Sequence, residues 1–66
     1  MVLKIRLRPQ QGEDPNDAID KCVEFIRGKT SGLIEINRLQ QTIEVFGAAH
    51  GLYHEAVSNG FNVEEV

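Results

Sequence analysis

The stretch that most constrains this fold is residues 32–47, GLIEINRLQQTIEVFG, which carries two alternations of apolar and polar residues around a polar connection. Ile34 and Ile36 mark the first alternation, and Ile43 and Val45 mark the second. Because side chains on a strand point alternately to opposite faces, this period of two predicts two strands that each bury one face. Pairing them in register leaves RLQQ as a four-residue loop, and no Asn-Gly pair is present to close a tighter turn. The stretch is therefore expected to be a β-hairpin.

Two further strands are expected at the ends of the chain. The first covers residues 2–8, and Pro9 ends it because proline has no N–H to donate to a strand ladder. A last short strand is expected over residues 62–66, with Val63 pointing inward. The first strand alternates between an apolar and a mostly basic face: Leu3, Ile5 and Leu7 on one side, and Val2, Lys4, Arg6 and Arg8 on the other.

A helix is expected between the first two strands. Asp14 and Pro15 form a strong helix start, since aspartate accepts hydrogen bonds from the free N–H groups and proline suits the first helical position. Gly28 is expected to end the helix. Between these points apolar residues recur at helical spacing: Ala18, Ile19, Cys22, Val23, Phe25 and Ile26.

A second, weaker helix is expected after the hairpin, over residues 49–57. Gly51 would lie inside it and cost roughly 1 kcal/mol relative to alanine. Asn59 and Gly60 are expected to close it in the left-handed conformation, with Phe61 supplying a hydrophobic contact.

The order of elements is thus strand–helix–strand–strand–helix–strand in a single domain of residues 1–66. With right-handed crossovers, this order predicts an α+β fold of the ferredoxin-like, split βαβ type. Its four-stranded antiparallel sheet should have the order 4-1-3-2, with both helices on one face. The opposite face would remain open, and it is the surface most available for binding.

The outward side chains predict a charged part and an apolar part on this open face. Lys4 is expected between Glu44 and Glu64, as a charge-paired surface that contributes little energy. Arg6 and Arg8 are expected to remain unpaired at one end.

At the other end the hairpin register places Leu33 opposite Phe46, close to Val2. An exposed aromatic residue with arginines on the same surface is typical of an interface core. The alternative is that a terminus shields Phe46, or that isolated surface hydrophobes have no role. The expected partner-binding residues are Val2, Arg6, Arg8, Leu33 and Phe46.

Metal binding and RNA binding are alternatives. His50 and His54 lie four residues apart on the second helix and could both reach a metal ion, but a third ligand would have to be Glu55 or a residue from another chain. RNA-recognition domains of this fold stack bases on two or three aromatic residues, and here Phe46 alone could serve. The net charge of −3 also disfavours phosphate binding, so nucleic acid is not an expected partner. Cys22 lies in the apolar stripe and is expected to be a small core residue.

In topology the chain resembles two families. It is similar to a metallochaperone (heavy-metal-associated) domain, but residues 9–13 lack the Cys-x-x-Cys that such domains carry after the first strand. It also resembles the phosphocarrier of the sugar phosphotransferase system, which has a histidine at the start of the first helix, where this chain has Asp14 and Pro15. The functional residues of neither family are present.

No nucleophile with a neighbouring base and no phosphate-binding glycine loop is evident, so neither enzyme activity nor a cofactor is expected. No apolar run of about 18 residues is present, which argues against a membrane span. A single cysteine favours the reducing cytoplasm. The resulting hypothesis is a non-catalytic protein–protein interaction module: an adaptor, small subunit or inhibitor, of the kind that phages and plasmids carry. Its partner would be another protein or a second copy of itself.

Overall fold

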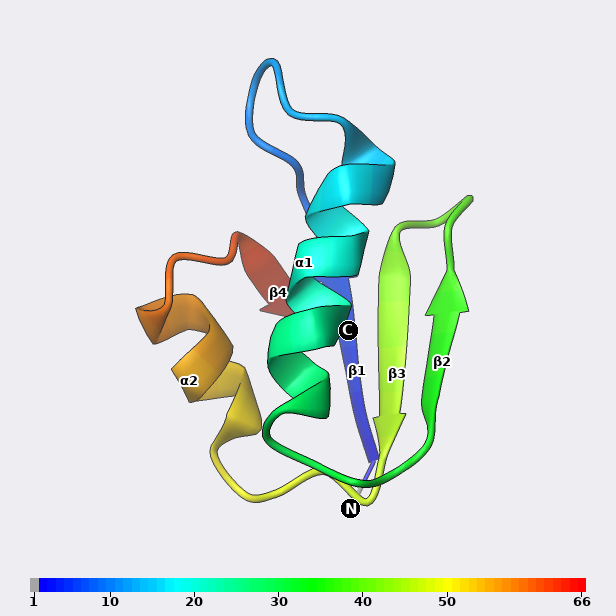
Figure 1. The fold of residues 1–66 in the computed structure, drawn as a ribbon, viewed down its shortest axis with the longest axis vertical. Helices are drawn as coiled ribbons and strands as arrows, with labels where there is room; N and C mark the ends of the chain where they lie inside the picture. The colour runs from blue at the N-terminus through cyan, green and yellow to red at the C-terminus, as the bar shows by residue number, and fades with distance from the viewer. Residues whose placement is uncertain (1) are drawn as a thin grey trace.

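The computed structural model describes residues 2–66 as four strands and two helices around one core (Figure 1). The strands form one antiparallel sheet in the order β2-β3-β1-β4, and both helices lie on one face of it. This is the predicted ferredoxin-like fold, because the order read from the other edge is 4-1-3-2. The elements are β1 (Val2–Leu7), α1 (Pro15–Arg27), β2 (Ile34–Asn37), β3 (Thr42–Phe46), α2 (Leu52–Ser58) and β4 (Val63–Glu65).

The hairpin of β2 and β3 has the predicted register and loop. Ile34 is the Cα partner of Val45, and Ile36 is the partner of Ile43. The loop places Gln41 at a φ of 59°, a left-handed conformation that non-glycine residues adopt in tight connections. The two alternations of the sequence therefore pair directly with each other.

The start of α1 is capped as predicted. The Asp14 carboxylate accepts hydrogen bonds from the backbone N–H groups of Asn16 (2.8 Å) and Asp17 (3.4 Å), which have no partner within the helix. Gly28 ends the helix in a right-handed conformation, with a φ of −74°. Five of the six predicted apolar positions are buried, and Phe25 is half-buried.

The prediction for the start of α2 was wrong. The helix begins at Leu52, and Gly51 precedes it with a φ of +87°, so Gly51 is the cap residue and not an interior position. The predicted interior cost therefore does not arise, because glycine adopts this conformation readily. Ala49 and Val57, at the two ends of the predicted range, are exposed, whereas Leu52 and Ala56 are buried.

The end of α2 follows the prediction. The backbone N–H of Phe61 donates to the carbonyl of Ala56, and the N–H of Gly60 donates to the carbonyl of Val57, both at 3.1 Å. This is the Schellman pattern, with Gly60 left-handed at a φ of +91°. The Phe61 ring contacts that of Phe25, with 5.2 Å between centroids, so this turn joins α2 to α1.

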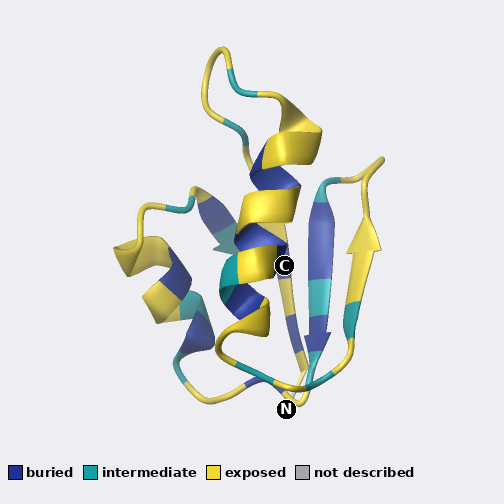
Figure 2. Cartoon of the chain, in the orientation of Figure 1, coloured by how far each residue is buried: buried dark blue, intermediate teal, exposed yellow. Residues whose placement is uncertain are grey.

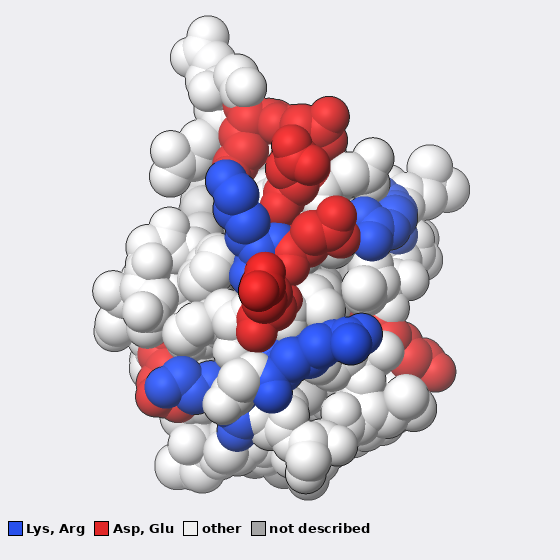
Figure 3. Space-filling model, viewed as in Figure 1, with Lys and Arg blue, Asp and Glu red and all other residues white. Residues whose placement is uncertain are grey.

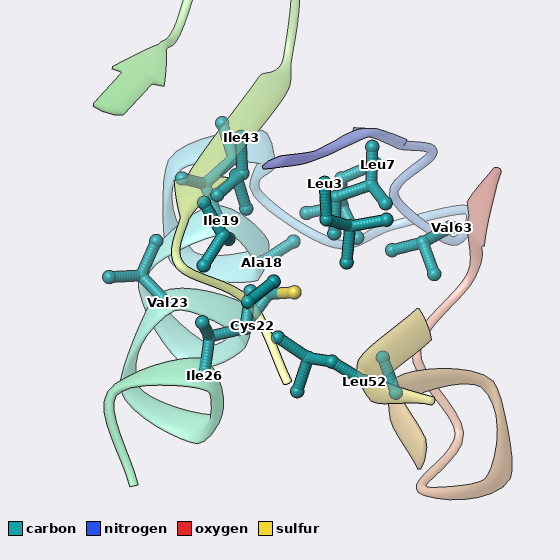
Figure 4. Close-up of a cluster of buried hydrophobic side chains, with 14 residues drawn as sticks. Leu3, Leu7, Ala18, Ile19, Cys22, Val23, Ile26, Ile43, Leu52 and Val63 are labelled. Carbon is teal, nitrogen blue, oxygen red and sulfur yellow. The ribbon is translucent and has the colours of Figure 1, made fainter. Parts of the chain in front are cut away.

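The core lies between the sheet and the two helices (Figures 2 and 4). Buried side chains come from the inward face of β1 and β3, from one stripe of α1, and from α2 and β4. Cys22 lies among them, as expected for a small core residue. Neither helix of residues 2–66 is long and apolar enough to cross a membrane.

Candidate interaction surface

The open face of the sheet carries the predicted apolar group, which consists of Val2, Leu33 and Phe46. Val2 is the Cα partner of Phe46, and the N–H of Phe46 donates to the carbonyl of Leu33 at 2.8 Å. Val2 is 55% exposed and Leu33 is 64% exposed, while Phe46 is half-buried. Because Val45 points into the core, Phe46 points to the opposite face, away from both helices. The three side chains therefore lie together at one end of the open face.

The charged part of this face differs from the prediction by two residues in the register of β4. Lys4 is opposite Glu44, as expected, but Glu64 is the Cα partner of Arg6. In the observed register, Val63 is buried opposite Leu7. A slip of two residues keeps every side chain on its face, so the alternation in the sequence did not distinguish the two registers.

The prediction that Arg6 and Arg8 are unpaired was also wrong. Arg8 donates to one carboxylate oxygen of Glu64 from Nη2 at 2.7 Å and from Nε at 3.0 Å, and Arg6 approaches the same oxygen at 4.0 Å. All three side chains are substantially exposed, so these pairs contribute at most about 1 kcal/mol. The basic end of the face is thus partly neutralised within the chain.

A pair of acidic residues on the open face was not identified from the sequence. Glu35 and Glu44 are direct cross-strand partners on β2 and β3. Within residues 2–66 neither carboxylate has a basic nitrogen within 4.0 Å, although Lys4 is the next residue across the sheet from Glu44. Like charges directly opposite each other destabilise a sheet. The predicted hairpin register already implied this pair and was the signal that could have found it.

Strand β2 is poorly covered on the helix side as well. Ile36 is 36% exposed and Ile34 is half-buried, whereas their partners on β3, Ile43 and Val45, have no exposed surface. Figure 1 shows the reason: α1 lies in front of β1, and β2 forms the edge of the sheet beyond the area that the helices cover. The alternation in the sequence predicted the face of these isoleucines but not the position of the helix above them.

The hairpin loop is tied to the start of α1. The guanidinium of Arg38 donates to a carboxylate oxygen of Asp20 at 2.7 Å and to the amide oxygen of Asn16 at 3.1 Å. On this helix-covered face, acidic side chains gather over α1 (Figure 3). Leu39, next to Arg38 in the loop, is 95% exposed.

The two histidines do not form a metal site with other side chains of residues 2–66, in which no group of three or more His, Cys, Asp or Glu could hold a metal ion. His50 lies in the turn before α2, and His54 lies on α2, where its ring packs edge-on against Tyr53 at 5.5 Å. Burial raises the pKa of the Cys22 thiol from 9.0 to about 11, so this thiol is neutral at physiological pH. A neutral, buried thiol does not suit a nucleophile.

No family model, curated protein or solved structure matched the chain in the three comparisons.

Proposed function

We propose that this chain is a small, non-catalytic protein–protein interaction module that binds a partner protein through the open face of its sheet. The observation that carries the proposal is the apolar group of Val2, Leu33 and Phe46, which lies on the face opposite both helices. Hot spots of interfaces are typically a few large side chains near the centre of the buried patch. Phe46 is the natural anchor, because it lies between the other two members of the group.

Burial of this apolar group against a partner would contribute favourable free energy to binding. Burying the exposed surface of a large apolar side chain contributes up to roughly 1.5–3 kcal/mol. Lys4 and Glu44, in the neighbouring row of the sheet, would form the polar rim that surrounds such a core. Arg6 and Arg8 would contribute by exchanging Glu64 for a carboxylate of the partner. A partner that is acidic opposite the arginines and apolar opposite Phe46 fits this face.

The proposal places the module in the cytoplasm, where a lone thiol such as Cys22 remains reduced. Its role would be that of an adaptor, small subunit or inhibitor. The partner is another protein or a second copy of the chain, and a mass measurement in solution over a range of concentrations separates these two.

The decisive experiment compares Phe46→Glu with Leu39→Glu in affinity capture from the native host. Both changes introduce a carboxylate, but Leu39 lies on the hairpin loop, away from the apolar group. We expect the wild type and Leu39→Glu to retain the same partner and Phe46→Glu to lose it, or to lose the dimer if the chain self-associates. Circular dichroism of both variants checks that they remain folded. Equal retention by folded Phe46→Glu would contradict the proposal.

A further inference from the structure

Strand β2 presents a free edge whose backbone groups are available to another strand. In an antiparallel ladder, alternate residues direct their N–H and C=O groups to the same neighbour. The carbonyl of Leu33 accepts from Phe46 on β3, so Glu35 and Asn37 also face β3. The N–H and C=O groups of Ile34 and Ile36 therefore point outward, to the side on which no other strand of residues 2–66 adjoins β2.

Within residues 2–66, β2 lacks several of the features by which proteins protect exposed strands, although it is short and carries one charged residue, Glu35. Such features include prolines, lysines, bulges and covering segments. The sequence of β2 is IEIN, and its register with β3 is continuous over all four residues. The opposite edge of the sheet, β4, has three residues, of which two are glutamates. Of the two edges, β2 is the longer and the more apolar.

Both faces beside the edge are hollowed. On the open face, a hollow of about 400 Å³ is lined by Lys4, Glu35 and Glu44, among others. On the helix side, one of about 580 Å³ is lined by Ile34 and Arg27, among others. Side chains of an added strand alternate between the two faces, so one beside Glu35 would lie over the first hollow and one beside Ile34 would lie over the second.

The negative charge of Glu35 determines which kind of strand would bind favourably at the β2 edge. An added strand that continues the sheet places one side chain beside Glu35, which already faces Glu44 without a basic partner in residues 2–66. Lys4 lies beyond Glu44, on the far side from Glu35, so a lysine or arginine at that position would place a positive charge directly beside Glu35. The residues before and after it would lie beside Ile34 and Ile36, whose exposed surface favours apolar neighbours.

A second copy of the chain fits this edge less well. Antiparallel self-pairing that aligns Ile34 with Ile36 places Glu35 opposite its own copy, next to two further Glu44 side chains. Shifting this self-pairing by two residues in either direction pairs one isoleucine with its own copy and leaves the other opposite a residue outside β2. The charge of this edge therefore favours a different, basic strand.

We propose that the β2 edge binds an extended segment of a partner protein by strand addition, and that this segment carries a lysine or arginine beside Glu35, with apolar residues on either side. The inference goes beyond the proposed function, because it depends on the edge and its charge and does not require Phe46. It assigns Ile34 and Ile36 as the backbone donors and acceptors, and Glu35 as the residue that determines specificity.

The test uses three end-blocked synthetic peptides and NMR of the whole chain. The first contains Thr-Val-Lys-Val-Thr, the second has Glu in place of Lys, and the third repeats the first with both valine nitrogens methylated. We expect the first peptide to shift the Ile34 and Ile36 amide signals and to slow their hydrogen exchange. The second should bind about two- to fivefold more weakly, and the methylated peptide should not bind, since it lacks the donors of a strand ladder.

Two charge reversals complete the test. Glu35→Lys should reverse the preference between the Lys and Glu peptides, while the matched change Glu65→Lys on β4 should leave it as in the wild type. The proposal is overturned if the Lys peptide leaves both isoleucine amides unperturbed at millimolar concentration, or if Glu35→Lys does not alter the preference. It is equally overturned if these amides are already protected by a concentration-dependent dimer, which would identify a second copy as the occupant. If Phe46→Glu loses the captured partner but still binds the Lys peptide, the open face and the β2 edge act independently, and the two proposals are tested separately.

Discussion

Replacing Gly32 by alanine should destabilise the fold by an amount out of proportion to one methyl group. Gly32 lies just before β2, and a Cβ added there would be 1.8 Å from the carbonyl oxygen of Phe46 and 3.0 Å from its carbonyl carbon. The oxygen belongs to the backbone of β3, so a side-chain rotation cannot relieve the overlap. Reaching the 3.0 Å limit that real Cβ contacts respect requires a movement of about 1.2 Å between the two backbones.

Such a movement would break the contacts that begin the hairpin. The N–H of Phe46 donates to the carbonyl of Leu33 at 2.8 Å, and the Thr30 hydroxyl joins the two segments by accepting from Gly32 N–H at 3.1 Å and donating to the Gly47 carbonyl at 3.3 Å. Each such hydrogen bond contributes roughly 0.5–1.5 kcal/mol. Overpacking elsewhere costs typically 1–3 kcal/mol, so we expect a loss of about 2–3 kcal/mol.

That loss is large for this chain, because a domain of this size has a stability of only about 3–5 kcal/mol. At roughly 4–8 °C per kcal/mol, the melting temperature should fall by about 10–20 °C. Urea unfolding followed by circular dichroism measures the loss in free energy of unfolding, and a thermal melt measures the fall in melting temperature. The matched control is Gly28→Ala, which makes the same chemical change at a φ of −74° where the nearest atom is 3.4 Å away. It should change stability by less than about 1 kcal/mol. A Gly32→Ala variant as stable as Gly28→Ala would refute the reasoning.

Three further predictions follow from local contacts. Asp14→Ala removes the cap of α1 and should lower the free energy of unfolding by about 1 kcal/mol in urea, whereas an unchanged midpoint would mean that the cap hydrogen bonds are not formed in solution. Glu35→Gln removes the repulsion from Glu44 and should raise stability by roughly 0.2–1 kcal/mol at low salt, and this gain should shrink as salt screens the charges. The Cys22 thiol has a higher pKa in the folded chain than in the unfolded chain, so the unfolded chain ionises first as the pH rises. Below pH 9 the thiol is neutral in both the folded and the unfolded state, and its contribution to stability is complete. This contribution is lost as the pH rises toward 11. The wild type should lose about 2 kcal/mol over that range, and Cys22→Ala, measured beside it, should lack this part of the pH dependence.

The fold was predictable because its strongest local signals agree with one another. The alternation around Ile34–Val45, the cap at Asp14 and the turn at Gly60 each determine an element or its end from adjacent residues. They leave a single simple topology once right-handed crossovers are assumed. These signals act over a few residues, which is why a single sequence was sufficient.

The errors arose where tertiary placement decides the outcome. Strand β4 has one apolar anchor, Val63, so its register could slip by two residues without changing any face, and Glu64 came to lie beside Arg6 and not Lys4. The exposure of Ile36 depends on where α1 crosses the sheet, and the spacing within either element does not determine that position. The sequence therefore predicted where Val2, Leu33 and Phe46 lie on the open face, but it did not predict that Arg6 and Arg8 pair with Glu64.

The difference between the two edges of the sheet has a consequence for aggregation. A head-to-tail fibre would require the β2 edge of one molecule to join the β4 edge of the next, an arrangement that repeats without limit. On β4, Glu65 shares the helix-side face with the buried Val63, so the junction would press its carboxylate against Ile34 and Ile36. Desolvating an unpaired carboxylate is costly. The proposed strand addition at β2 would thus be compatible with a β4 edge that resists growth into filaments.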